Sequence, residues 1–80
     1  MKVTIYGKPN CPNCVKAKNL CATKPAIEVE YIDIVEQGID AVKLGEICGT
    51  MVREVPQIFV DDKHVGGWSA LMPHVAQYQG

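Results

Sequence analysis

The sequence predicts an α/β fold in which a four-stranded mixed sheet packs with three helices in the order β-α-β-α-β-β-α. An apolar run, a segment with helical spacing and an alternating run follow one another within residues 3–34, which predicts a right-handed strand–helix–strand unit with parallel strands. A later apolar run at residues 55–60 is followed directly by a turn and a return strand, which predicts a hairpin. The 80 residues can build one small core, so we expect a single domain over residues 1–80.

The first strand is predicted at residues 3–6, where a near-continuous apolar run is typical of a strand buried on both faces. The helix that follows is predicted from Pro12 to about Thr23. Its inward positions recur at helical spacing: Cys14, Ala17 and Cys21. The residue before a proline is disfavoured in helical conformation, so Lys24 and Pro25 should end this helix.

A second strand is predicted at residues 27–34, which alternate between polar and apolar side chains. One face of it would carry Ile27, Val29 and Tyr31. After a loop at residues 35–39, Asp40 can cap a short helix that ends near Gly49. The side of that helix predicted to face inward carries Ala41, Leu44 and Cys48.

The second half of the chain is predicted to form a hairpin and a final helix. A strand at residues 55–60, opened by Pro56, leads into a turn at residues 61–63 and a return strand at residues 64–66. Ser69 can cap the last helix, whose inward positions recur at helical spacing: Leu71, Val75 and Tyr78. Proline fits only the first turn of a helix, so Pro73 predicts an irregular start.

Two cysteines three positions apart, Cys11 and Cys14, lie between the first strand and the first helix. Unsatisfied backbone N–H groups and the helix dipole favour an anion at a helix N-terminus. The thiolate of Cys11 should therefore be stabilised relative to its thiol, which makes Cys11 the predicted nucleophile. Pro12 suits the first helical turn, since its missing N–H would have had no partner there. Cys14, one turn further along, is placed to attack a mixed disulfide on Cys11.

Other interpretations of the cysteine pair find less support in the sequence. Half of a zinc site would need a second pair of ligands, but the remaining candidates are scattered single residues: Cys21, Cys48, His64 and His74. We therefore expect no metal. A structural disulfide across so short a loop would close little chain entropy. Cys21 and Cys48 could be regulatory thiols, but small buried hydrophobic side chains on the inner faces of helices are the favoured interpretation.

Composition points to a folded protein without a charged binding surface. The formal net charge is −1 and 48% of the residues are hydrophobic, which does not indicate a partner among nucleic acids. No apolar stretch approaches the roughly 18 residues that span a bilayer, and the N-terminus lacks the pattern of a signal peptide. We expect a cytoplasmic protein without a membrane partner. In that compartment a cysteine pair is more often catalytic or metal-binding than structural.

This order of elements, with a Cys-x-x-Cys motif after the first strand, resembles the thioredoxin fold, and more closely the glutaredoxin family. Four segments spread over the chain carry the resemblance: residues 8–14, 31–34, 55–60 and 64–67. It implies that Pro56 is a cis proline facing the Cys11 sulfur, whereas the residue alone would be an ordinary proline at a strand edge. It also implies glutathione as cofactor, with a binding site formed by Lys8, Asn13, Val55, Pro56, Gly67, Trp68 and Ser69.

The resemblance gives these residues individual roles. The Val55 backbone would pair with the cysteine moiety of glutathione, and Lys8 would meet a glutathione carboxylate, although a solvated lysine is the plainer interpretation. Trp68 would be an aromatic side chain beside the site or would pack against the last helix. Ser69 can offer its hydroxyl and an N–H to a carboxylate.

Three positions depart from the family pattern. Asn13 stands where tyrosine is common, Glu54 where threonine is common, and Ala70 where an acidic residue often binds the γ-glutamyl end. Glu54 could repel a glutathione carboxylate, and Ala70 cannot replace the acid.

The resemblance implies a dithiol oxidoreductase that reduces protein disulfides and glutathione mixed disulfides. Its partners would be glutathione and disulfide-bearing proteins such as ribonucleotide reductase, and we expect a monomer. Trp68-Ser69 also resembles a segment of glutaredoxin-like redoxins that thioredoxin reductase reduces in place of glutathione. A third possibility is a carrier of a [2Fe–2S] cluster held by Cys11 from two chains, which Pro12 disfavours.

Overall fold

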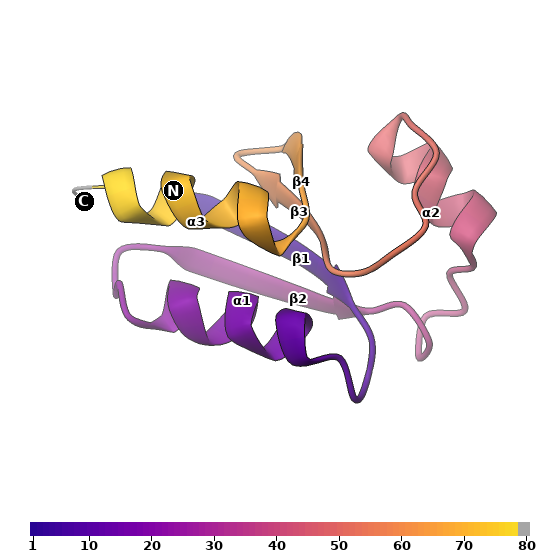
Figure 1. Ribbon diagram of the computed structural model, residues 1–80, viewed down its shortest axis with the longest axis horizontal. Helices are drawn as coiled ribbons and strands as arrows, with labels where there is room; N and C mark the ends of the chain where they lie inside the picture. The colour runs from indigo at the N-terminus through magenta and orange to yellow at the C-terminus, as the bar shows by residue number, and fades with distance from the viewer. Residues whose placement is uncertain (79–80) are drawn as a thin grey trace.

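Four strands form one mixed sheet in the order β2-β1-β3-β4 (Figure 1). The structure is a computed structural model that describes residues 1–78. The strands are β1 (Lys2–Gly7), β2 (Glu28–Asp33), β3 (Gln57–Val60) and β4 (Lys63–Gly66). β1 pairs in parallel with β2 and antiparallel with β3, and β3 pairs antiparallel with β4. The predicted strand–helix–strand unit and hairpin are both confirmed, and β1 joins them.

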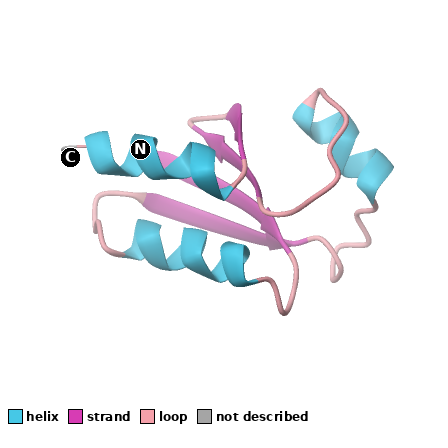
Figure 2. Cartoon of the chain, viewed as in Figure 1, coloured by secondary structure: helices cyan, strands magenta, loops and turns pink. Residues whose placement is uncertain are grey.

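Three helices complete the fold: α1 (Pro12–Ala22), α2 (Ala41–Cys48) and α3 (Trp68–Gln77). α1 and α3 lie side by side across one face of the sheet, whereas α2 lies apart from them beyond the sheet end (Figures 1 and 2). Within residues 1–78, none of the helices is long and apolar enough to cross a bilayer. The observed order β-α-β-α-β-β-α is the predicted one.

The core lies between the sheet and the pair α1 and α3. It consists of residues from both helices and three strands or strand ends: Val3, Ile5, Ala17, Cys21, Ile27, Ile58, Val60, Leu71 and Val75. Cys21 is fully buried there, which confirms its interpretation as a small hydrophobic side chain. Val29 and Tyr31 of β2 are half-buried against this core, so the predicted inward face of β2 is confirmed.

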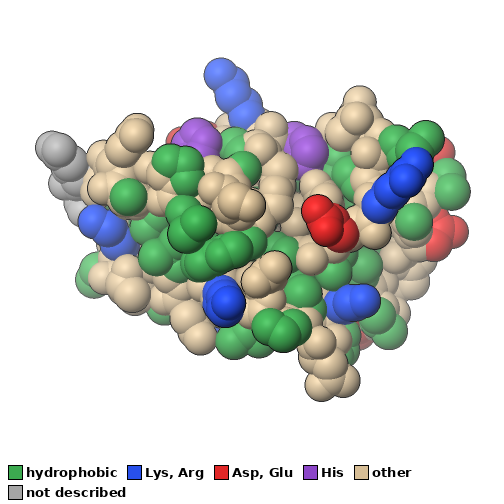
Figure 3. All heavy atoms as spheres, viewed as in Figure 1, with side chains coloured by type: hydrophobic (Ala, Val, Ile, Leu, Met, Phe, Trp, Pro, Cys, Tyr) green, Lys and Arg blue, Asp and Glu red, His purple; other side chains and the backbone are tan. Residues whose placement is uncertain are grey.

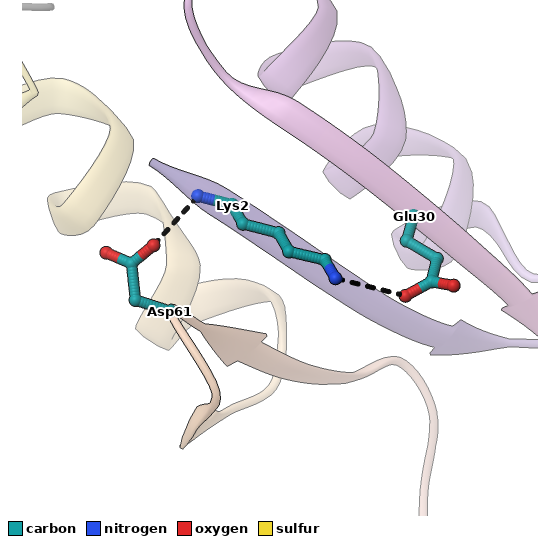
Figure 4. Close-up of polar contacts among 3 residues, drawn as sticks. All are labelled: Lys2, Glu30 and Asp61. Atoms are coloured by element: carbon teal, nitrogen blue, oxygen red, sulfur yellow. Dashed lines mark hydrogen bonds and ion pairs between the residues drawn. The ribbon is translucent and has the colours of Figure 1, made fainter.

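Lys2 connects β1 to both of its neighbours (Figure 4). Its backbone N–H donates to Asp61 Oδ1 at 2.9 Å, and its Nζ lies 3.7 Å from Glu30 Oε1. Both side chains of the ion pair are exposed, so the pair contributes about 0–1 kcal/mol to stability. The hydrogen bond holds the turn between β3 and β4 against the start of β1.

The β3–β4 turn consists of Asp61 and Asp62, whose φ angles are 49° and 68°. Positive φ at both central residues is the conformation of the two-residue hairpin turn that matches sheet twist. Lys63, which the sequence placed in the turn, is already in β4. β3 begins at Gln57, so Pro56 precedes the strand and the prediction of a strand from residue 55 was wrong at its start. Proline has no N–H to donate to the hydrogen bonds between strands, so the pairing begins at the next residue, Gln57.

α2 is attached less tightly than the other helices. Asp40 accepts a hydrogen bond from the Lys43 N–H at 2.8 Å, and the helix ends at Gly49, as predicted. Of its predicted inward residues only Leu44 is buried; Cys48 is half-buried and Ala41 is exposed, so the prediction was wrong for Ala41 and only partly right for Cys48. Ala41 borders an open hollow with Val42 and Met51. A second open groove, lined by residues that include Tyr6, Ile32 and Ile47, lies between α2 and the other sheet face.

The last helix begins earlier than predicted. Gly67, not Ser69, is the N-cap of α3, and Ser69 is the second residue of the helix. Gly66 has a φ of 125°, a conformation that favours glycine, and this sharp bend starts the helix directly after β4. Pro73 is the sixth residue of α3, so its predicted place in the first turn was wrong. Leu71 and Val75 are buried as predicted, while Tyr78 caps the helix end.

Charged side chains do not gather on the face seen in Figure 3. Lysine and arginine side chains are scattered among apolar and polar surface there.

Candidate functional site

Cys11 lies at the N-terminal end of α1 as its N-cap residue, with extended backbone (φ −109°, ψ 105°). The Cys14 N–H donates a hydrogen bond to Cys11 Sγ at 3.3 Å, so the sulfur satisfies one of the free donors of the first turn. Pro12 occupies the first helical position, as predicted. A helix N-terminus favours negative charge, and the Cys11 sulfur receives a backbone N–H directly.

Cys14 is the more deeply placed of the two thiols. Its relative exposure is 0% against 8% for Cys11, and all cysteines of the chain are free thiols. Burial and a hydrogen bond with the Cys11 side chain raise the pKa of Cys14 to about 11, although hydrogen bonds from the Lys8 backbone and the Tyr31 hydroxyl act in the opposite direction. In the dithiol form Cys14 therefore holds its proton at neutral pH. Of these two thiols, Cys11 is the one that keeps some exposure to solvent.

The backbone of Val55 lies against the accessible sulfur. The Cys11 thiol donates to the Val55 carbonyl oxygen at a distance of 3.7 Å, and the Val55–Pro56 peptide bond is cis, as the resemblance implied. Among residues 1–78, no hydrogen bond uses the backbone N–H of Val55. This segment thus presents a free donor beside the nucleophile, just before β3 begins.

A groove of about 470 Å³ runs beside the cysteine motif. Its lining combines the end of the motif, the segment before β3 and the start of α3: Asn13, Glu54, Val55, Pro56, Gly67, Trp68, Ser69 and Ala70. Trp68 is half-buried, is itself the first residue of α3 and packs against the core, so it is neither the exposed side chain nor the one packed against the last helix that the sequence suggested. The sequence-predicted residues Asn13, Val55, Pro56, Gly67, Trp68 and Ser69 are therefore brought together at one place.

Lys8 lies outside this groove. It lines a smaller neighbouring cavity with Leu44 of α2 and with Arg53, and the two hollows share Glu54 and Val55 as a common wall. The acidic Glu54 thus lines both the cavity of Lys8 and the predicted binding groove.

Two residues beside the buried thiol, Gly7 and Tyr31, were not among the predicted site residues. A Cβ at Gly7 would overlap the Tyr31 hydroxyl and lie 3.0 Å from Cys14 Sγ, so the hydroxyl and the sulfur both lie against Gly7. Burial, followed by the charge of Cys14 and a hydrogen bond with it, raises the pKa of Tyr31 to about 12. The signal that could have found them is register, because Tyr31 pairs with Ile5 and shares its sheet face with Gly7.

This geometry is suited to thiol–disulfide exchange. Exchange needs an accessible thiolate that attacks and a second thiol that reaches the first one but not the solvent. Cys11 and Cys14 meet these requirements by their unequal burial and their spacing of one helical turn. No group of three or more histidine, cysteine or acidic side chains within residues 1–78 is arranged to hold a metal ion.

Comparison with known sequences identifies relatives over most of the chain. The family model of glutaredoxin matches residues 3–65. Glutaredoxin 1 of Salmonella typhimurium is 44% identical over 71 residues, which cover 84% of this chain and 82% of the relative.

Comparison with solved structures gives the same family. Reduced Escherichia coli glutaredoxin superposes with a TM-score of 0.82 at 36% identity, covering 96% of this chain and 95% of that chain. The buckwheat glutaredoxin–glutathione complex superposes with a TM-score of 0.72 at 25% identity, covering 89% of this chain and 64% of that chain.

Proposed function

Because the chain belongs to the glutaredoxin family and is a thiol–disulfide oxidoreductase, we propose that it reduces protein disulfides and glutathione mixed disulfides with glutathione as its reductant. The observation that carries the proposal is the unequal burial of Cys11 and Cys14 beside a groove of about 470 Å³. The buckwheat relative was solved as a complex with glutathione, which supports the same ligand here.

The groove offers backbone donors for a peptide-like ligand. The free N–H of Val55 can pair with the cysteine moiety of glutathione as an added strand would. At the other side, the N–H and hydroxyl of Ser69 lie at the start of α3, where a carboxylate is favoured. Asn13, Pro56, Gly67 and Trp68 would form the walls between these two contacts.

In the proposed reaction the Cys11 thiolate attacks one sulfur of a protein disulfide. A mixed disulfide forms, and the released protein thiolate takes up a proton. Cys14 then loses its proton and attacks the Cys11 sulfur, which forms the Cys11–Cys14 disulfide and releases the second protein thiol. One glutathione thiolate opens this disulfide at Cys11, and a second removes the first as glutathione disulfide. Two electrons pass from two glutathiones to one protein disulfide.

The partner proteins follow from this chemistry. We propose disulfide-bearing enzymes such as ribonucleotide reductase as substrates and a monomer as the working form. A monomer fits the mechanism, because both sulfurs of the relay belong to one helix end.

The electron donor is the first point to test. NADPH consumption during reduction of a protein disulfide would be followed in two parallel assays, one with glutathione and glutathione reductase and one with thioredoxin reductase. Turnover in the glutathione assay is expected. The control is the Cys11→Ser variant, which removes the nucleophile and should be inactive in both assays.

A second donor has a specific observation in its favour. Ala70 lines the groove where the family often has an acidic residue, and Glu54 lines it as well, so the charges around a bound glutathione differ from the usual pattern. Reduction by thioredoxin reductase does not require this groove to hold glutathione. Turnover with thioredoxin reductase alone would replace glutathione as the proposed donor.

A further inference from the structure

We propose that the Tyr31 hydroxyl is the positioning group of the buried thiol: it donates a hydrogen bond to the Cys14 sulfur and stabilises the thiolate that attacks the mixed disulfide. This inference rests on the proposed role of Cys14 as the resolving thiol. It adds a residue from β2, outside the cysteine motif and outside the groove, to the reaction.

The backbone brings the two groups together at Gly7. A Cβ placed on Gly7 would lie 3.0 Å from Cys14 Sγ and would overlap the Tyr31 hydroxyl. Glycine at the end of β1 therefore leaves the space that the hydroxyl and the sulfur share. The pairing of Tyr31 with Ile5 in the parallel register places its ring on the face covered by α1.

Charged and titratable groups surround this contact from each neighbouring element. From α1, Lys18 Nζ lies 5.3 Å from the centre of the Tyr31 ring, and Cys11 lies at the helix N-terminus. From β2, Asp33 acts on Tyr31 and raises its pKa further, after burial and the charges of the two thiols. The Lys8 backbone donates to Cys14 from the loop after β1.

Tyr31 keeps its proton at neutral pH and can therefore act as a donor. Burial is the first cause that raises its pKa to about 12, and burial and Cys11 raise the pKa of Cys14 to about 11. Two of the causes that raise the pKa of Cys14 depend on Cys11, namely its hydrogen bond and its charge. A mixed disulfide on Cys11 removes that charge, whereas Tyr31 and the Lys8 backbone continue to favour the thiolate. The buried thiol thus becomes easier to ionise at the stage that needs it.

The step itself is an ordinary exchange. The Cys14 thiol gives up its proton, its sulfur forms a bond with Cys11 Sγ, and the bond between Cys11 and the target sulfur breaks. The target sulfur leaves with the electron pair and takes up a proton. Cys14 and Cys11 are oxidised to a disulfide while the target is reduced, and Tyr31 keeps its proton throughout.

A stopped-flow reaction of the reduced protein with the chromogenic disulfide dithiobis-nitrobenzoate separates the two thiols. The first thiolate released reports attack by Cys11, and the second reports attack by Cys14 on the mixed disulfide. In Tyr31→Phe, which keeps the ring, the second phase should slow roughly tenfold at neutral pH, since a hydrogen bond to a charged group is lost. Its pH profile should move upward by roughly one pH unit, and the first phase should not change.

Controls distinguish the possible failures. Tyr6→Phe removes a hydroxyl from the opposite face of the same sheet and should leave both phases unchanged. With Cys48 replaced by serine, because this half-buried thiol could react with the reagent on its own, Cys14→Ser should release one thiolate only; release of two would show that Cys14 does not resolve and would refute the proposed relay. An unchanged second phase in Tyr31→Phe would overturn the inference. A slower second phase with an unshifted pH profile would also overturn it, because that is the result of a merely structural role.

Discussion

The different environments of Cys11 and Cys14 divide the reaction into two half-reactions. Cys11 is 8% exposed and receives an N–H at the helix end, whereas Cys14 is fully buried one turn further along. In the proposed mechanism, attack on a small glutathione mixed disulfide needs Cys11 alone, whereas release from a protein mixed disulfide needs Cys14 as well.

Replacement of Cys14 should separate these half-reactions. Cys14→Ser is expected to retain much of the activity on small glutathione mixed disulfides and to lose reduction of protein disulfides. Both activities would be measured by glutathione consumption with a small and a protein substrate. Serine at Cys21, a buried thiol of the same helix outside the motif, is the matched control for loss of a sulfur. Sustained protein-disulfide reduction by Cys14→Ser would refute the resolving role.

Position 7 requires glycine because neighbouring side chains approach its backbone closely, and not because of its backbone conformation. Its Cβ would overlap the Tyr31 hydroxyl and crowd Cys14 Sγ, so Gly7→Ala should lower the free energy of unfolding by about 1–3 kcal/mol, as overpacking does. Denaturant unfolding of the reduced protein measures this. In the Tyr31→Phe background the overlapped hydroxyl is absent, and the cost should be smaller. Equal costs in the two backgrounds would show that Tyr31 is not the obstacle.

At the scale of elements, Pro73 is the feature that contradicts local preference. It is the sixth residue of α3, so its missing N–H leaves the Ser69 carbonyl without the usual helical partner. Pro73 is exposed, so Pro73→Ala should add that hydrogen bond without changing the core. We expect the free energy of unfolding to rise by about 2 kcal/mol.

Thermal and denaturant unfolding of Pro73→Ala measure this gain. His74→Ala, a substitution at the next exposed position of the same helix, is the control for a simple increase in helix propensity. A loss of stability in Pro73→Ala would mean that the proline stabilises α3 through its restricted unfolded state.

Most helices and strands could be predicted from local sequence, because each has characteristic residues at its ends. Asp40 and Gly49 delimit α2, and Pro12 opens α1, in the structure as in the sequence. The start of α3 could not be settled in this way, since glycine and serine both serve as N-caps and the bend after β4 selected Gly67. The loose attachment of α2 depends on packing across an open groove, which periodicity does not reveal.

The site residues that lie within sequence motifs could be predicted. The role of the cysteine pair was predicted from its place at a helix N-terminus, and the groove residues were predicted from the family resemblance. The contact between Tyr31 and Cys14 at Gly7 was missed, because it depends on the register of β1 against β2. A shift by one residue would turn Tyr31 to the other face of the sheet.

At the scale of the whole molecule, the buried thiols and tyrosines determine how stability depends on pH. Burial is the main cause that raises the pKa of Cys14 to about 11 and of Tyr31 to about 12, and it also raises the pKa of Cys21, Cys48 and Tyr6. Each group therefore loses its proton more easily in the unfolded chain than in the fold. The stability that they contribute is fully present below their ordinary values of 9.0 for cysteine and 10.0 for tyrosine, and it is lost as pH rises through the folded values.

The reduced protein should therefore keep its stability near neutral pH and lose it as the pH becomes alkaline. Denaturant midpoints measured with excess reductant at successive pH values should be level near neutrality and fall from about pH 9 upward. Cys21→Ala removes one buried thiol and should decline less steeply with pH, even though the cavity lowers its stability at neutral pH. A midpoint that stays level up to pH 11, or the same slope in Cys21→Ala as in the parent chain, would show that these thiols ionise as easily in the fold as out of it.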